Sequence, residues 1–190
     1  MNSALAAQAG VPADVLSAIQ KIESSGRANA VRFETRLFRE RTGQTIEGSS
    51  RAVFEQAFRI NARAAVESSS FGLYQVLGGA LIRLYGSPEA GLRAFDANPA
   101  RVSDQLLVAW FQSRPQAQEA AREGNWTELA RLYNGSSTTP WLGRFQRALA
   151  EVRGGAGGIH PALGFALGFG AIAGAAALIW LVTRERGAST

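Results

Sequence analysis

Hydrophobic residues in the first 152 positions recur mostly three and four residues apart, which is the spacing of a helix face turned toward a core. Val15, Ile19 and Ile22 show the pattern, and prolines and glycines mark several starts and stops. Only residues 31–34 suggest a short extended piece. The fold class predicted is all-α, an α-rich domain over 1–152. The predicted helices are 4–9, 12–23, 36–41, 52–66, 80–85, 88–95, 99–112, 115–122, 126–132 and 142–152.

A different hydrophobic pattern follows this domain. Residues 153–160 are rich in glycine and predict a linker, and residues 161–182 contain no charged side chain. An apolar stretch of about 20 residues is long enough to cross a bilayer as one helix. We therefore predict a transmembrane helix at 161–183, in contact with membrane lipid, and a short basic tail at 184–190.

The ends of the chain suggest how such an anchor is used. The first ten residues lack the basic and apolar regions of a signal peptide, so none is expected. Arg184 and Arg186 favour the inner face of the membrane for the tail, with the domain on the outer side. Glycines four residues apart at 164 and 168, and at 170 and 174, favour self-association of the helix.

Composition narrows the chemistry. The chain has no cysteine and one histidine, His160. Nucleophilic hydrolases of the Ser-His-Asp or Cys-His type need an imidazole beside the nucleophile, and most zinc sites need several His or Cys ligands. No metal or other cofactor is therefore expected, and carboxylates are left to transfer protons.

The net charge of +5 attracts polyanions in general. The basic residues are spread along the chain, and no helix combines clustered bases with base-reading side chains. A nucleic-acid partner is therefore not expected, and nucleic-acid binding is the weakest of the functions that the sequence suggests.

Glu23 is the first candidate for such chemistry. It lies at the predicted end of the helix 12–23, at the edge of the buried face, with Gly26 as the helix stop. Burial and the negative end of the helix dipole both raise the pKa of a carboxyl group. That position suits a general acid, although a glutamate at a helix end can also simply face solvent.

Three polar stretches lie at predicted helix boundaries: IESSG at 22–26, ESSSFGLYQV at 67–76 and LYNG at 132–135. Together they supply hydroxyls, amides and aromatic faces, which are the groups that bind acetamido sugars. Singly, each stretch also reads as an ordinary turn.

These stretches resemble, in order, the catalytic-acid helix, the S-x-G-L-x-Q loop and the Y-N-x-G turn of lytic transglycosylases and goose-type lysozymes. FETRLFR at 33–39 and the 67–75 stretch are more closely similar to the N-acetylmuramidase domain of phage endolysins. The resemblance covers roughly residues 4–150. The predicted transmembrane helix lies outside it.

The resemblance implies a lysozyme-like fold and cleavage of the β-1,4 bond between N-acetylmuramic acid and N-acetylglucosamine in peptidoglycan. It implies Glu23 as the general acid and Glu34 as the second catalytic carboxylate, with Glu67 as the runner-up. Binding of the sugars falls to Glu67, Ser69, Ser70, Gln75, Tyr133 and Asn134.

Two alternatives stay open at this point. A lytic transglycosylase would use the muramic 6-hydroxyl in place of water and give 1,6-anhydro products, and a non-catalytic wall-binding membrane protein would keep only the fold. The expected setting is a phage-encoded protein, in an internal virion membrane beside other virion proteins or in the bacterial inner membrane. It would act at entry or at host lysis.

Overall fold

The structure is a computed structural model that describes residues 3–135 and 140–154. Helices dominate it, and the sequence predicted most of their bounds to within two residues. They are α1 Ser3–Ala9, α2 Ala13–Ser24, α3 Thr35–Thr42, α4 Arg51–Ile60, α5 Ala62–Glu67, α6 Gly79–Tyr85, α7 Pro88–Ala97, α8 Pro99–Gln112, α9 Pro115–Glu123, α10 Trp126–Asn134 and α11 Pro140–Gly154.

The predicted single helix at 52–66 is wrong, because the chain breaks at Asn61. This residue takes an extended backbone conformation (φ −151°, ψ 96°) between α4 and α5. Its side-chain oxygen accepts a hydrogen bond from the Ala64 amide at 2.9 Å, so Asn61 is the N-cap of α5.

A small sheet adds to the all-α prediction. Strands β1 (Val31–Phe33), β2 (Ser69–Phe71) and β3 (Val76–Leu77) pair antiparallel in that order, with Arg32 opposite Ser70. The extended piece expected at 31–34 is β1. The serine stretch, predicted only as a polar loop, also forms β2 and β3 around a tight turn.

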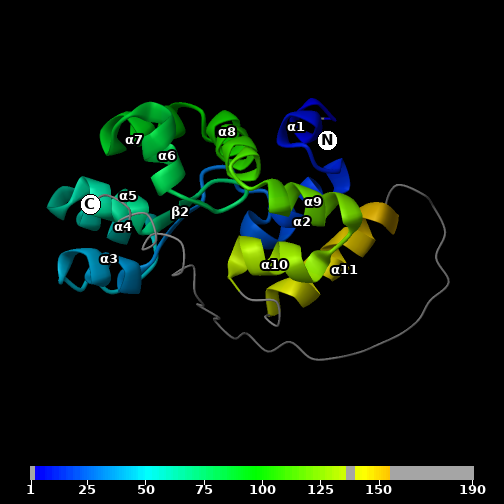
Figure 1. Cartoon of the computed structure of the whole chain (residues 1–190). Helices are drawn as coiled ribbons and strands as arrows, with labels where there is room; N and C mark the ends of the chain where they lie inside the picture. The colour runs from blue at the N-terminus through cyan, green and yellow to red at the C-terminus, as the bar shows by residue number, and fades with distance from the viewer. Residues whose placement is uncertain (1–2, 136–139, 155–190) are drawn as a thin grey trace, which may run out of the picture.

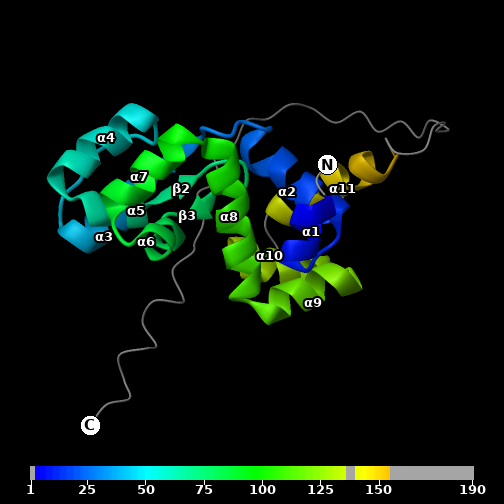
Figure 2. The same ribbon diagram turned by 90° about the horizontal axis from the view of Figure 1, so that it is seen from above.

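The helices form two groups on either side of α8 (Figures 1 and 2). Helices α3 to α7 and the sheet lie on one side, and α1, α2, α9, α10 and α11 lie on the other. Each side has its own aromatic cluster. Phe71 packs edge-on against Phe54 and Phe95 on the sheet side, and Trp141 stacks on both Tyr133 and Phe145 on the other.

The predicted membrane helix at 161–183, most of the linker at 153–160 and the tail at 184–190 lie outside the described residues. Within the ranges 3–135 and 140–154, no helix has the length and apolar character needed to cross a bilayer. The last described helix, α11, continues to Gly154.

Candidate active site

Glu23 lies in the last turn of α2 and is half-buried. The helix ends at Ser24 because Ser25 (φ 53°) and then Gly26 (φ 81°) take left-handed backbone conformations. The indole Nε1–H of Trp141, at the start of α11, donates a hydrogen bond to Oε1 of Glu23 at 2.6 Å. A residue 118 positions away in the chain therefore holds the predicted acid.

The surroundings of Glu23 favour its protonated form. Burial raises the pKa of the Glu23 carboxyl, and this effect outweighs the Trp141 hydrogen bond and the positive charges of Arg32 and Arg144, which lower it. The raised pKa agrees with the expectation from sequence, since desolvation disfavours the charged form.

Tyr133 joins the Glu23 region to the loop between β2 and β3. Its hydroxyl donates a hydrogen bond to the backbone oxygen of Tyr74 at 2.5 Å, and its ring stacks on Trp141 with centroids 5.6 Å apart. Burial, and next the charge of Glu23, raise the pKa of Tyr133 well above its usual value. The phenol therefore stays neutral and acts as a hydrogen-bond donor.

The same loop is tied to the end of α2. Ser24, one residue after Glu23, donates its hydroxyl hydrogen to the Leu73 carbonyl at 2.8 Å, and the Leu73 amide donates to Oγ of Ser103 at 3.1 Å. The three polar stretches identified in the sequence, at 22–26, 67–76 and 132–135, thus meet at one place.

Gly72 allows this close approach. Its φ of +75° is left-handed, and a Cβ at this position would lie 1.9 Å from the Ser103 hydroxyl oxygen. We predict that Gly72→Ala lowers the free energy of unfolding by about 3 kcal/mol, through backbone strain and overpacking. Urea denaturation measures this loss.

Gly79→Ala is the matched control, because its added Cβ would meet only the flexible end of Arg83, at 3.7 Å. Its stability should stay within about 0.5 kcal/mol of wild type. Equal stabilities for the two variants would contradict the role given to Gly72.

Glu34 follows β1 and precedes α3. Its amide donates a hydrogen bond to the Ser68 carbonyl at 2.9 Å, and its Oε1 forms an ion pair with Nε of Arg32 at 2.8 Å. Arg32 is also close enough to Glu23 to lower the pKa of that carboxyl. The two predicted catalytic carboxylates therefore share Arg32 as a neighbour.

Glu67, the runner-up, has different neighbours. At the end of α5, its carboxylate pairs with Arg41 of α3 at 3.5 Å and with Arg63 of its own helix at 3.4 Å. Both ion pairs are partly exposed, and the pair with Arg41 bridges α3 and α5. Glu34, unlike Glu67, therefore shares a charged neighbour with Glu23.

The other predicted sugar-binding residues differ in burial and in their hydrogen bonds. Ser69 is fully buried and donates its hydroxyl hydrogen to the Ala65 carbonyl at 2.8 Å. The Gln75 amide nitrogen donates to the Gly72 carbonyl at 3.0 Å, which braces the loop. Ser70 is buried on β2 opposite Arg32, and Asn134 is half-buried at the end of α10.

Sequence reasoning missed three neighbours of Glu23: Trp141, Arg32 and Arg144. Each reaches Glu23 from another element, namely α11 or β1. Neither Trp141 nor either arginine stands in a local pattern typical of catalysis, so only the folded chain identifies them.

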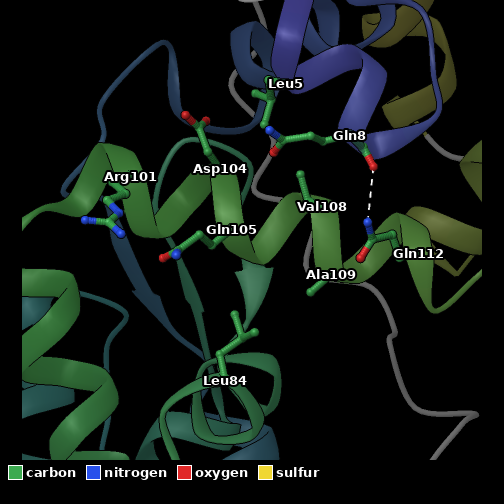
Figure 3. A pocket seen from close by; sticks show the side chains of 9 residues that line it. All are labelled: Leu5, Gln8, Leu84, Arg101, Asp104, Gln105, Val108, Ala109 and Gln112. Carbon is green, nitrogen blue, oxygen red and sulfur yellow. Dashed lines mark hydrogen bonds between the residues drawn. The ribbon is translucent and has the colours of Figure 1, made fainter.

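A pocket of about 430 Å³ lies along α8 between α1 and α6, lined by Leu5, Gln8, Leu84, Arg101, Asp104, Gln105, Val108, Ala109 and Gln112 (Figure 3). Neither Glu23 nor Glu34 lines it. Asp104 accepts a hydrogen bond from the Tyr74 hydroxyl at 3.3 Å, and burial raises the pKa of Asp104. Tyr74 thus bonds to a lining residue of this pocket through its hydroxyl group, and it accepts the Tyr133 hydrogen bond through its backbone carbonyl.

Within the described parts of the chain, no three His, Cys, Asp or Glu side chains are grouped so that they could hold a metal ion. The groups that shift the pKa of Glu23 are an indole and two guanidinium groups, and Glu23 in turn raises the pKa of the neighbouring Tyr133 phenol.

Comparison with known proteins gives one family and one fold. A family model described as Muramidase (N-acetylmuramidase) matches residues 47–143. The crystal structure of the Burkholderia AP3 phage endolysin is similar, with a TM-score of 0.65 and 18% sequence identity over 82% of this chain and 70% of that one. No curated protein matches the sequence. Glu23 and Glu34 precede the matched range, so their roles depend on their surroundings in the fold.

Proposed function

The chain belongs to the N-acetylmuramidase family of peptidoglycan-cleaving glycoside hydrolases, and we propose that it hydrolyses the β-1,4 bond between N-acetylmuramic acid and N-acetylglucosamine with Glu23 as general acid. One observation carries the assignment. Glu23 is a half-buried carboxyl with a raised pKa, held at a helix end by the Trp141 indole and next to the loop at 72–75.

The first chemical step is proton transfer to the glycosidic oxygen. A carboxyl that keeps its proton near neutral pH gives it to this oxygen as the bond from the oxygen to C1 of N-acetylmuramic acid breaks. N-acetylglucosamine leaves with the transferred proton, and positive charge develops at C1. The Glu23 carboxylate that results is stabilised by the Trp141 N–H and by the charges of Arg32 and Arg144.

Glu34 is proposed to activate the attacking water. In an inverting hydrolase, a second carboxylate removes a proton from water on the opposite face of the sugar ring. The shared neighbour Arg32 supports Glu34 over Glu67 for this role. The competing reaction is attack by the muramic 6-hydroxyl, which needs no such base and gives a 1,6-anhydro product.

The sugar-binding residues divide into two proposed roles. The side chains of Ser69, Gln75 and Tyr133 donate hydrogen bonds to backbone carbonyls, which supports a role in shaping the site. Ser70, Asn134 and Glu67 are proposed to contact the acetamido sugars or to hold neighbouring groups that do. Substitution of the first set should therefore lower stability as well as activity.

The bond that is cut is identified by the reducing end of the product. Full-length protein should release muropeptides from purified peptidoglycan, and borohydride reduction should convert their new reducing ends to muramitol. Mass spectrometry distinguishes this product from glucosaminitol. Glucosaminitol ends would mean that the other glycosidic bond is cut, and the proposed specificity would be wrong.

We further propose that residues 161–183 anchor the domain in a membrane, with the domain on the wall side, and that the protein is phage-encoded. The uncharged segment at 161–182 supports the anchor, and the fold shared with a phage endolysin supports the source. Self-association through the glycines of the segment and contact with other virion proteins remain predictions. The same proposal covers an internal virion membrane and the bacterial inner membrane.

Deletion of residues 159–190 tests the anchor. The full-length protein should float with lipid in a density gradient, and the deletion variant should remain in the soluble fraction with its muramidase activity intact. A deletion variant that still floats with lipid would show that residues 161–183 are not the anchor.

A further inference from the structure

Trp141 is bound to Glu23 in a way that distinguishes the two carboxyl oxygens. Its Nε1–H donates to Oε1 at 2.6 Å, which is short for a hydrogen bond from nitrogen to oxygen. Trp141 is only 1% exposed. The indole is therefore a fixed, water-excluded donor.

We propose that Trp141 is a positioning residue, and that its indole N–H keeps Oε1 of Glu23 as a hydrogen-bond acceptor so that the catalytic proton resides on Oε2. This inference rests on the proposed function, in which Glu23 is the general acid. It adds the atom that donates the proton and the residue that selects this atom.

The selection follows from hydrogen-bond chemistry. An indole N–H is a donor only, whereas a protonated carboxyl group has one O–H donor and one carbonyl acceptor. If the proton lay on Oε1, that oxygen would be a poorer acceptor and its hydrogen would be crowded against the indole N–H. The arrangement with the proton on Oε2 satisfies both groups.

The same bond helps the reaction forward. When Glu23 gives up its proton, negative charge develops on the carboxylate, and a hydrogen bond to a charged group is stronger than one to a neutral group. The indole is already in place and needs no reorganisation at that moment. Trp141 therefore orients the carboxylic acid before proton transfer and stabilises the carboxylate afterwards.

Trp141 is itself held rigidly. Its ring stacks on Phe145 with centroids 5.1 Å apart and planes 5° from parallel, and on Tyr133 at 5.6 Å. Tyr133 is anchored in turn by its hydrogen bond to the Tyr74 carbonyl. Through this stack, the packing of α10 and α11 fixes the position of the indole against the last turn of α2.

Trp141→Phe keeps most of the stack and removes the donor. The charged groups that act on Glu23 are Arg32 from β1 and Arg144 from α11, and the titratable group on which Glu23 acts is Tyr133 from α10. They stay in place, so loss of a hydrogen bond that lowers the pKa of Glu23 should raise this pKa further.

The expected result is a fall in kcat of about tenfold to a hundredfold, because the acid loses its orientation. Activity should also persist to higher pH than in wild type, because a general acid is lost as the pH rises through its pKa. The measurement is the pH dependence of muropeptide release by the full-length protein.

Trp126→Phe is the matched control. Trp126 belongs to the same aromatic cluster, and its ring centroid lies 5.4 Å from that of Phe145. In the part of the chain that the structure describes, Trp126 forms no hydrogen bond with Glu23. The Trp126→Phe variant should leave the high-pH limb unchanged, that is, the decline of activity as the pH rises. A folded Trp141→Phe variant that loses activity without moving this limb, or that keeps wild-type kcat and limb, would overturn the proposal.

A measurement on the wild-type protein covers the case in which Trp141→Phe does not fold. The indole Nε1–H resonance of Trp141 should move with pH at the same midpoint as the Glu23 carboxyl. A resonance that ignores this titration would overturn the proposal. Failure of the proposed function is a separate outcome, since a Glu23→Gln variant that keeps its activity would show that Glu23 is not the general acid.

Discussion

Glu23→Gln should lower kcat for peptidoglycan cleavage by about 10²- to 10⁴-fold, the usual contribution of a general acid. The amide is nearly the same size as the carboxyl, and its oxygen can still accept the Trp141 hydrogen bond. The substitution therefore removes the transferable proton while preserving the geometry of the site. Release of soluble muropeptides from purified peptidoglycan measures the loss.

The variant should not lose activity through unfolding. The pKa of Glu23 is raised by folding, so its contribution to stability is complete below the unfolded pKa and is lost as the pH rises through the folded pKa. The amide of the variant does not titrate and avoids that loss. At about pH 8 the Glu23→Gln variant should melt at or above the melting temperature of the wild type, and the difference should shrink at about pH 4.

Glu151→Gln is the matched control for loss of a carboxylate in the same region. Glu151 lies on α11 and forms an exposed ion pair with Lys21, two residues before Glu23 on α2. Since exposed pairs contribute little to stability, this variant should keep wild-type activity. Similar losses for both variants would indicate a general effect of charge and remove Glu23 from its role.

The second large effect is expected for Glu34→Gln. If Glu34 activates water, the rate of hydrolysis should fall by about 10²-fold or more, while binding to peptidoglycan is retained. Mass spectrometry of the muropeptides separates reducing ends, which come from water, from 1,6-anhydro ends, which come from the muramic 6-hydroxyl.

Glu67→Gln is the comparison that tests the choice of carboxylate. Glu67 pairs with Arg41 and Arg63, so its substitution should loosen the contact between α3 and α5 and reduce hydrolysis much less. A larger loss for Glu67→Gln than for Glu34→Gln would reverse the assignment. Wild-type products with only 1,6-anhydro ends would make the protein a lytic transglycosylase and remove the need for either base.

Local patterns in the sequence predicted the features that are set by residues close together in the chain. Helix positions followed from the spacing of apolar residues, as in α8, whose bounds match the prediction. The position of Glu23 at a helix end with a raised pKa followed from the buried stripe of α2 and the turn after it. These features need only a few residues on either side.

The remainder depends on contacts that no local pattern encodes. The break at Asn61 is set by one capping side chain inside an otherwise helical stretch. Strands β2 and β3 are three and two residues long, too short for an alternation to be visible. Trp141 becomes part of the site only because α11 packs along α2 and brings its first turn to the end of that helix (Figure 1).

The most direct test of the account is the titration of Glu23 itself. Carbon-13 NMR of the labelled Glu23 carboxyl should give a pKa above the ordinary range of glutamate, and muropeptide release should decline with rising pH at the same midpoint. A Glu23 pKa in or below the ordinary range, with activity unaffected by that titration, would contradict the assignment of Glu23 as the proton donor.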